Sequence, residues 1–495
     1  MNEKVNFGKF IWSLRMPYLW ILLIVVPLEF LIFKMQYPYP NFRGDSVSYI
    51  AAAFMHADAA EWPVGYSKFL SLIHYFSHSD TILVSFQYLL LELSALLFLF
   101  SLKYFIQFGK VVFNIVFAFI VFNPLFLHLG NYIMSDGLFI SLSLLWITQL
   151  LWILYRPSPL QIIPHALILL CLFTVRYNAL FYPLVSSLAF VLSSLRRSVK
   201  IAGILLSIVL IGLFIGYTEN KFYALNGVRQ FSPFGGWQLA NNALYMYTNV
   251  ELKPSAEVPT QFQELDSVIR QSFISARKKG MILNPYIKDY YIWDGNSPLM
   301  QYLKYKWEGD TMTDMFTKWA SMGPLYSDYG KYLIQEHPAA YLGHFVSPNM
   351  SNFFQPTIAD LGYYNQGTNS IDYIIAKWFD YKTMTMTHVP ENSELSVIRP
   401  YPFFMAIFNF CFLLCILLFV LFNEFKKLPR AFNHTAIVIT CFWLLNFLFS
   451  TLASSIELRY QVFQLILNVF FSIISIELLI KFSNTQKQQI ITVGM

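Results

Sequence analysis

Charged residues are scarce in this sequence of 495 residues. Asp, Glu, Lys and Arg make up 13% of the chain, whereas soluble globular proteins carry roughly 25%. Hydrophobic residues reach 56% and gather in runs of about 20, the length that spans the apolar core of a bilayer. The composition excludes a soluble globular protein. It predicts an all-α polytopic membrane protein, with the lipid bilayer as its surroundings.

Cysteine is also rare, and its placement excludes a disulfide scaffold. All four cysteines lie in apolar runs, and the long polar segment 218–400 has none. That segment must therefore fold without disulfides. Nucleotide and metal signatures are missing as well, since there is no GxxxxGK[ST], HExxH or CxxC. His74 and His78 have no obvious third ligand in the first loop, so we expect neither a metal nor another cofactor.

The apolar runs predict about ten spanning helices. The first run continues past the length of a signal peptide into Glu29 and Lys34 without a small-residue cleavage site, so we expect it to be retained. The stretch 161–195 is either one broken helix or two short helices. The predicted helices cover residues 17–34, 81–102, 111–129, 137–155, 161–175, 178–195, 201–217, 401–422, 434–454 and 460–480.

The distribution of Lys and Arg predicts the orientation. With a cytoplasmic N-terminus, every inner segment is basic, as the positive-inside rule requires, and the short outer turns hold only Arg176 and Arg459. Because the basic residues mark helix ends, the net charge of +6 does not indicate nucleic-acid binding. We therefore expect a multi-pass protein of the cell inner (plasma) membrane with both termini in the cytoplasm.

Three regions follow from this topology. Residues 1–217 form an N-terminal transmembrane module that includes a first outer loop, 35–80. Residues 218–400 are too long for a mere connection, and we expect them to form a mostly helical extracytoplasmic domain. Residues 401–495 supply the last transmembrane helices and a short cytoplasmic tail.

Acids and bases from distant segments fall at the same predicted membrane face. Charges at membrane depth are costly, and they usually face a cavity or a partner. Cations at such a face can hold a phosphate, and an acid can take a proton from an attacking hydroxyl. These residues are Asp45 and Glu61 in the first outer loop, Asp136 at the start of the fourth helix, Arg176 at the next outer turn, and Glu457 and Arg459 in the last one.

Structural interpretations stand beside these functional ones. Asp45 and Asp136 occupy positions where helix N-caps are expected, and an aspartate can be both cap and catalyst. Arg176 and Arg459 can simply extend to the membrane interface. The tryptophans of the outer segment can stack on sugars or pack in its core; they are Trp237, Trp293, Trp307, Trp319 and Trp378.

Four stretches resemble the GT-C superfamily of glycosyltransferases, which includes protein O-mannosyltransferases and the aminoarabinose transferases of lipid A. Their order and predicted sidedness match those of the family, and they span most of the helical part of the chain. The stretches are GDSVSY at 44–49, EWPVGYSKFLSLIHYF at 61–76, NPLFLHLGNYIMSDGLF at 123–139, and the late pair Arg459 and Tyr460.

The resemblance implies a GT-C-like helical bundle and a reaction. Family members transfer a sugar from a polyprenyl phosphate to an extracytoplasmic acceptor in one inverting displacement, without a nucleotide sugar. The family's first-loop acid, its proposed general base, corresponds to Asp45. The expected ligands of the donor phosphate are Arg176, Arg459, Arg43 and Lys68, and the expected supporting residues are Asp136, Glu61, Tyr49 and Tyr460.

The chain departs from the family pattern at two positions. Trp62 stands where some members have Lys, and Ser46 follows Asp45 where some have a second acid. The acceptor stays open between a glycolipid, a glycan and a protein. Two alternative functions stay open as well. One is a polymerase or ligase for lipid-linked polysaccharides; the other is a transporter or flippase, although the chain lacks the paired halves typical of transporters.

Overall fold

The computed structural model describes residues 6–42, 44–251, 254, 257–279, 289–387 and 394–493. Within these residues the regular structure is helical, with isolated β-bridges in place of strands. Eight of the described helices are long and apolar enough to cross a membrane, and two shorter apolar helices accompany them. The fold is that of an all-α polytopic membrane protein, as the composition predicts.

The apolar helices follow the predicted spans. The stretch 161–195 forms two short helices, α9 and α10, joined by a 3₁₀ turn at Tyr177–Phe181. The helices are α2 (Arg15–Gln36), α5 (Asp80–Ile106), α6 (Lys110–Val121), α7 (Pro124–Gly130), α8 (Ser135–Tyr155), α9 (Ile162–Val175), α10 (Tyr182–Leu192), α11 (Arg197–Asn226), α21 (Tyr401–Leu421), α22 (Arg430–Ala453) and α23 (Leu458–Val493).

Local sequence signals set where several of these helices begin and end. Asn123 caps α7 and precedes Pro124 at its first position, so the predicted run 111–129 is divided between α6 and α7. Helix α11 continues past the predicted end at residue 217 to Asn226. It stops at Gly227, whose φ of 72° is a left-handed conformation that glycine adopts without steric cost.

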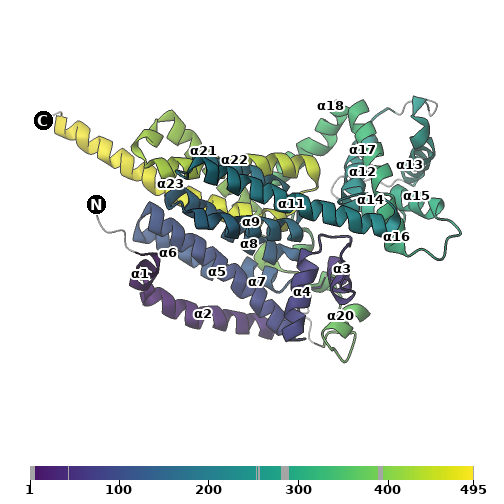
Figure 1. Cartoon of the computed structure of the whole chain (residues 1–495), viewed down its shortest axis with the longest axis horizontal. Coiled ribbons are helices and arrows are strands. Elements are labelled where there is room, and N and C mark those ends of the chain that lie inside the picture. Colours follow the sequence, from purple (N-terminus) through teal and green to yellow (C-terminus); the bar gives the residue numbers. More distant parts are fainter. Residues whose placement is uncertain are drawn as a thin grey trace.

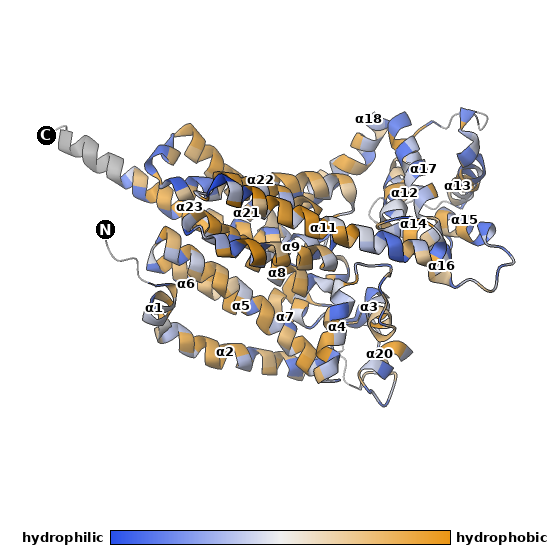
Figure 2. Cartoon of the chain, in the orientation of Figure 1, coloured by the Kyte–Doolittle hydropathy of each residue, from blue (hydrophilic) through white to orange (hydrophobic). Residues whose placement is uncertain are grey.

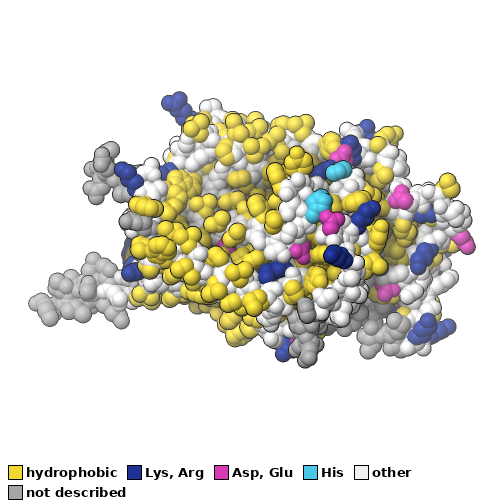
Figure 3. Space-filling model, turned by 90° about the horizontal axis from the view of Figure 1, so that it is seen from below, with side chains coloured by type: hydrophobic (Ala, Val, Ile, Leu, Met, Phe, Trp, Pro, Cys, Tyr) yellow, Lys and Arg dark blue, Asp and Glu magenta, His cyan; other side chains and the backbone are white. Residues whose placement is uncertain are grey.

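The spanning helices form one elongated bundle (Figure 1). Helices α5, α8 and α23 are mostly buried, whereas α2 and α11 expose most of their apolar side chains. The hydropathy colouring shows that apolar residues predominate along these helices (Figure 2). On the face seen in Figure 3, hydrophobic side chains cover the bundle and the charged ones lie mainly toward its two ends. Such an exterior suits contact with lipid.

The two ends of the bundle differ. Helix α1 (Phe7–Ser13) and the far end of α23 lie at one end, and the helical domain lies at the other (Figure 1). Basic side chains meet at the end that holds α1: Arg156 stacks over Tyr104 at 4.7 Å, and Lys427 lies over Phe482 at 5.7 Å. The predicted inner segments that hold Arg156 and Lys427 therefore lie at this end.

A second hydrophobic core, from Phe222 to Val346, defines the helical domain. Helices α12 and α17 pack so closely that a Cβ on Gly236 would lie 1.9 Å from the carbonyl oxygen of Gly323. The helices of the domain are α12 (Pro233–Tyr247), α13 (Thr260–Lys278), α14 (Tyr290–Trp293), α15 (Pro298–Lys306), α16 (Met315–Ser321), α17 (Gly323–Glu336) and α18 (Pro338–Tyr341).

The described part of the segment that follows Val346 contributes side chains to the core of the bundle. Helices α19 (Ser347–Phe354) and α20 (Tyr373–Trp378) contribute Phe353 and Trp378 to that core. Helix α20 packs on α3 (Gly44–Phe54) in the first loop, where Phe54 contacts Trp378 at 6.3 Å. The first loop is thus covered by a segment more than 300 positions later in the chain.

Candidate functional site

Hydrogen bonds tie the start of α3 to the start of α8. The Ile133 amide donates to the Asn41 carbonyl at 3.2 Å, and the Ser46 hydroxyl donates to the Ile133 carbonyl at 2.8 Å. The Tyr49 hydroxyl lies 3.0 Å from that of Ser135. These contacts bring the acids at the two helix starts to the same place.

Two cations reach the same place from other helices. Arg176 follows α9 in an extended conformation, so its side chain leaves the helix axis. The amide of Leu458 donates to the Thr357 carbonyl at 2.9 Å, which fixes the start of α23 and sets Arg459 in its first turn. The stretch between α19 and α20 therefore positions the last helix.

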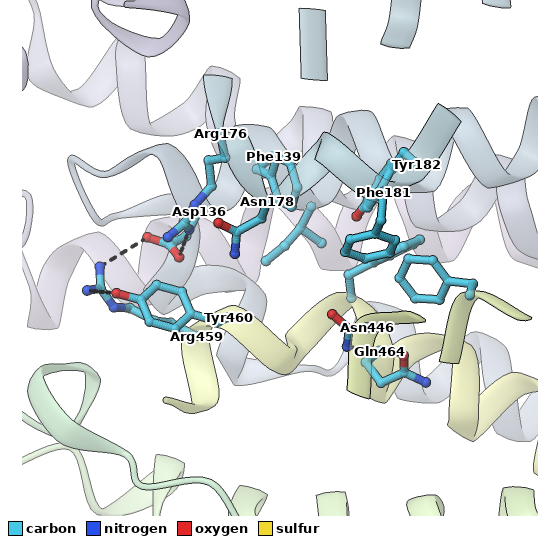
Figure 4. A pocket seen from close by; sticks show the side chains of 13 residues that line it. Asp136, Phe139, Arg176, Asn178, Phe181, Tyr182, Asn446, Arg459, Tyr460 and Gln464 are labelled. Carbon is cyan, nitrogen blue, oxygen red and sulfur yellow. Dashed lines mark hydrogen bonds and ion pairs between the residues drawn. The ribbon is translucent and has the colours of Figure 1, made fainter. Parts of the chain in front are cut away.

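The resulting ionic cluster consists of Asp45, Asp136, Arg176, Glu457 and Arg459. Asp136 lies at its centre: one carboxylate oxygen pairs with Nη1 of Arg176, and the other lies 3.5 Å from Nη1 of Arg459 (Figure 4). Nε of Arg459 lies 2.9 Å from Glu457, and its Nη1 lies 3.9 Å from Asp45. Each buried charge of the cluster thus faces an opposite one, which offsets part of its desolvation cost.

Tyr460 packs against both arginines of the ionic cluster. Its hydroxyl accepts a hydrogen bond from Nη2 of Arg459. Its ring lies 4.7 Å from the Arg176 guanidinium carbon and 4.5 Å from that of Arg459, within the range of cation–π contact. One tyrosine therefore fixes the orientation of both guanidinium groups.

A cavity of about 550 Å³ opens on the ionic cluster, within the usual size range of small-molecule sites. Behind it, beside Asp136 and Tyr460, a chamber of about 20 Å³ leaves room for roughly one water molecule (Figure 4). The walls of the large cavity come from the bundle and from the domain; they include Asp45, Ser48, Glu61, Trp62, Arg176, Asn178, Phe234, Gln238, Trp293, Gln366, Glu457, Arg459 and Tyr460.

Glu61 stands on the rim of this cavity. The Ser48 hydroxyl donates to its Oε2 at 2.6 Å. Burial raises the pKa of Glu61, the Ser48 hydrogen bond opposes that rise, and the negative charge of Asp45 adds to it. Ser48 and Glu61 also border an apolar groove of about 670 Å³ between α3 and the end of α11. Glu61 therefore separates a polar cavity from an apolar groove.

Two of the four predicted phosphate ligands, Arg176 and Arg459, meet in the ionic cluster. Lys68 on α4 (Gly65–Phe76) instead pairs with Asp58 at 3.0 Å, and Lys221 holds the same carboxylate at 2.9 Å. These two lysines hold the pKa of Asp58 well below its usual range. Arg43 lies outside the described residues.

Tyr49 and Tyr460, predicted as supporting residues, both lie against the ionic cluster, and Tyr49 is buried. Burial raises the pKa of Tyr49 above its usual value, so its hydroxyl stays protonated. Glu61 and Asp136 contact the site as well, one on the rim and one at the centre.

Some cavity residues, such as Gln238 and Gln366, and one pairing, that of Glu457 with Arg459, escaped the sequence analysis. Gln238 and Gln366 are neutral amides in polar segments, where no motif distinguishes them. Glu457 stands out by its charge, but not as the partner of Arg459. Among the tryptophans of the outer segment, Trp237, Trp319 and Trp378 are core residues, whereas Trp293 is 38% exposed and lines the cavity.

The site joins an accessible carboxylate to two guanidinium groups, so it can accept a proton and hold an anion. Within the described residues, no group of three or more His, Cys, Asp or Glu side chains has a geometry that could hold a metal ion. No known protein family, curated protein or solved structure matches the chain.

Proposed function

We propose that the chain is a membrane glycosyltransferase that moves a sugar from a polyprenyl-phosphate carrier to an extracytoplasmic acceptor. One observation carries this proposal. The Asp45 carboxylate and the Arg459 guanidinium, from opposite ends of the sequence, lie 3.9 Å apart and line one cavity. Transfer from a lipid phosphate needs a proton acceptor beside a cation that stabilises the leaving phosphate.

The proposed reaction is a single displacement. The acceptor hydroxyl oxygen attacks the anomeric carbon on the face opposite to the phosphate, so the configuration inverts. The carbon–oxygen bond to the phosphate breaks, and its electron pair leaves with the lipid phosphate. The hydroxyl proton passes to the Asp45 carboxylate. Arg459 and Arg176 then face a phosphate that has gained a second negative charge, which charge-assisted hydrogen bonds stabilise.

Exposure favours Asp45 over the other acids as the proton acceptor. Its side chain is 24% exposed, whereas that of Glu457 is 9% exposed and that of Asp136 is fully buried. Asp136 and Glu457 also make the closer contacts to the arginines. We assign both of them as positioning residues that hold the guanidinium groups toward the cavity.

The apolar groove beside α3 supports a lipid-linked donor. It shares Ser48 and Glu61 with the cavity, and its walls are mainly small or apolar side chains, such as Ala51, Met55 and Leu225. Its other charged lining residues are the Asp58–Lys221 ion pair and Asp314. An isoprenoid chain attached to a phosphate in the cavity can leave through this groove, where it keeps its apolar surface away from water.

The positive-inside rule supports the orientation of the site. The end of the bundle that holds α1 carries Arg156 and Lys427 from two of the predicted inner loops, so we assign it to the cytoplasm. The domain and the cavity then face the other side of the inner (plasma) membrane, where an extracytoplasmic acceptor is available.

The test is mass spectrometry of glycolipids and surface glycans from cells with the gene, without it, and with the Asp45→Asn variant. We expect the deletion and the variant to lack one sugar on an envelope glycan and to accumulate that sugar on a polyprenyl phosphate. Unchanged glycans would overturn the proposal. An oligosaccharide that accumulates on a lipid pyrophosphate would indicate a polymerase or ligase instead.

A further inference from the structure

Three aromatic side chains form a continuous aromatic wall on the domain side of the cavity: Trp62, Phe234 and Trp293. The Trp62 ring lies 4.9 Å from Phe234 and 5.8 Å from Trp293, and the Phe234 and Trp293 rings are stacked at 6.2 Å. The wall is thus assembled from the first loop, α12 and α14. An aromatic surface of this kind binds apolar faces without requiring charge.

A stack of indoles holds the wall rigidly. Trp293 stacks on Trp319 at 5.7 Å, and Trp319 stacks on Trp237 at 5.3 Å. The Trp237 indole N–H also donates to the Trp319 carbonyl at 2.9 Å. Trp237 and Trp319 are buried in the domain core, whereas Trp293 remains partly exposed at the cavity. The exposed ring is therefore presented in a fixed orientation, which lowers the entropy cost of binding.

Polar groups border the aromatic wall. Gln238 lies one helical turn after Phe234 on α12, and its amide N–H donates to Asn242 at 2.7 Å, so its side chain is held in place. The indole N–H of Trp62 is buried and has no acceptor among the described residues. An unsatisfied buried donor is costly, so this edge of the wall carries a polar group whose hydrogen-bonding capacity is unused.

Gln366 reaches the cavity from a strained turn. Asn365 and Gln366 both adopt left-handed conformations, with φ of 46° and 54°, which residues with a Cβ rarely occupy. The Asn41 side chain holds the turn by accepting the Asn365 amide at 2.8 Å. Strain that is maintained beside a cavity points to a role for the residue that it presents.

We propose that the aromatic wall binds a pyranose ring of the acceptor, which makes the acceptor a glycan or a glycolipid. A pyranose has an apolar C–H face that can stack on Trp293 and hydroxyl groups at its edge that both donate and accept. The amides of Gln238 and Gln366 also donate and accept, so they match those hydroxyls. The assignment to the acceptor rests on the proposed function; the assignment of a sugar-binding wall does not.

The aromatic wall and the two arginines come from different parts of the molecule, which assigns the wall to the acceptor and the arginines to the donor. The donor phosphate belongs beside Arg176 and Arg459, which arise from the bundle, whereas two of the three rings of the wall arise from the domain. A serine or threonine of a protein acceptor would bring only a hydroxyl and would leave most of the aromatic wall uncovered.

The test measures sugar binding without turnover. Saturation-transfer NMR detects methyl α-pyranosides of mannose, glucose and galactose on the purified full chain in detergent. We expect at least one pyranoside to bind, and Trp293→Ala to weaken that binding about tenfold or more. Trp307→Ala is the matched control, because Trp307 lies in the same domain, contacts Lys318 and does not line the cavity.

A second variant separates binding from folding. Gln366→Gly removes the amide and also relieves the left-handed strain, so we expect weaker sugar binding at equal or higher thermal stability. Unchanged pyranoside binding in both Trp293→Ala and Gln366→Gly would overturn the proposal. Binding of a serine peptide in place of the pyranosides would also overturn it.

The two proposals fail differently. Asp45→Asn should still bind pyranosides, because Asp45 is not part of the aromatic wall. If no variant affects sugar binding while Asp45→Asn abolishes transfer, the aromatic wall is wrongly assigned and the function stands. If Trp293→Ala loses sugar binding while the purified wild-type chain transfers no sugar from any polyprenyl-phosphate donor, the proposed function fails and the sugar-binding wall stands.

Discussion

Asp45 is the most exposed acid of the ionic cluster, and its contact with Arg459 is the longest. The N-cap interpretation of the two aspartates is wrong, because Asp45 lies inside the first turn of α3 and Asp136 inside that of α8. Asp45→Asn keeps the shape of the side chain, so the protein should insert normally and change in stability by no more than about 1 kcal/mol. If Asp45 takes the hydroxyl proton, transfer should fall about 10²–10⁴-fold. A transfer assay with a polyprenyl-phosphate sugar, beside a thermal melt, measures both quantities.

Asp328→Asn is the control for this experiment. Asp328 pairs with Lys331 at 3.2 Å on the exposed surface, where loss of one charge should change neither transfer nor stability appreciably. An active Asp45→Asn enzyme would remove Asp45 from the proposed mechanism and leave Glu61, which also lines the cavity, as the next candidate.

Substitution of Asp136 should lower the stability of the protein, whereas substitution of Asp45 should lower transfer. Its fully buried carboxylate pairs with Arg176 and Arg459, so Asp136→Ala leaves both guanidinium groups without their central counter-charge. Breaking a buried ion pair costs about 3–5 kcal/mol. We expect a clear fall in the thermal unfolding temperature in detergent. A variant that melts with the wild type would contradict the positioning role of Asp136.

The raised pKa of Glu61 predicts a pH dependence of stability. The folded chain holds the Glu61 proton more tightly than the unfolded chain does, so this residue destabilises the fold as pH rises from the ordinary glutamate pKa of about 4.3 through the raised value. Glu61→Gln cannot ionise and can still accept from Ser48. Over that interval the melting temperature of Glu61→Gln, relative to that of the wild type, should rise with pH, and parallel curves would refute the prediction.

At the level of single residues, the sequence predicts which charged side chains form the site but not which of them pair with each other. Asp45, Asp136, Arg176 and Arg459 stand out because a charge at the end of an apolar helix is rare. The Glu457–Arg459 contact and the presence of Gln366 at the cavity depend on how distant segments pack. Lys68 looks equally suitable in the sequence, yet it lies on a face of α4 that directs it to Asp58.

Close packing of α12 on α17 yields a prediction for neighbouring glycines. A Cβ on Gly236 would collide with the Gly323 backbone, whereas a Cβ on Gly235 meets no atom within 4 Å. Gly236→Ala should therefore destabilise the domain by about 1–3 kcal/mol or more. Gly235→Ala should stabilise it by up to about 1 kcal/mol, through helix propensity. Thermal melts of the two variants check this, and equal shifts would contradict the observed packing.

The helices are predictable where an apolar run fills their whole length, because membrane thickness sets that length. The sequence fails where a helix continues into polar residues, as α11 does between 218 and 226. The sequence also does not show where, within 218–400, the domain ends and the bundle resumes. Phe353 and Trp378 look like core residues of the domain but pack with the bundle. Hydrophobicity shows that a side chain is buried, but not against which neighbour.

For the molecule as a whole, the testable property is orientation. Reporter fusions after Lys200, Pro254 and Lys427 should read cytoplasmic, extracytoplasmic and cytoplasmic, because basic segments are retained on the cytoplasmic side. An inward reading at Pro254 would place the domain and the cavity in the cytoplasm, and an acceptor outside the cell membrane could then not be reached.

Counting helices along the sequence predicts more of the architecture than any single motif does. An even number of crossings returns the chain to its starting side, which agrees with α1 and the end of α23 at one end of the bundle and the domain at the other (Figure 1). The number of helices does not predict that α20 covers the first loop, because this covering depends on contacts such as that of Phe54 with Trp378.

The order in which the ionic cluster is synthesised has a consequence for biogenesis. Asp136 and Arg176 emerge early and can neutralise each other while the first helices enter the membrane. Glu457 and Arg459 leave the ribosome much later, with the start of α23, so the cluster stays incomplete until that helix docks. Under the proposed function, a nascent chain that lacks α23 cannot consume the lipid-linked sugar, and docking of this helix is itself the event that starts turnover.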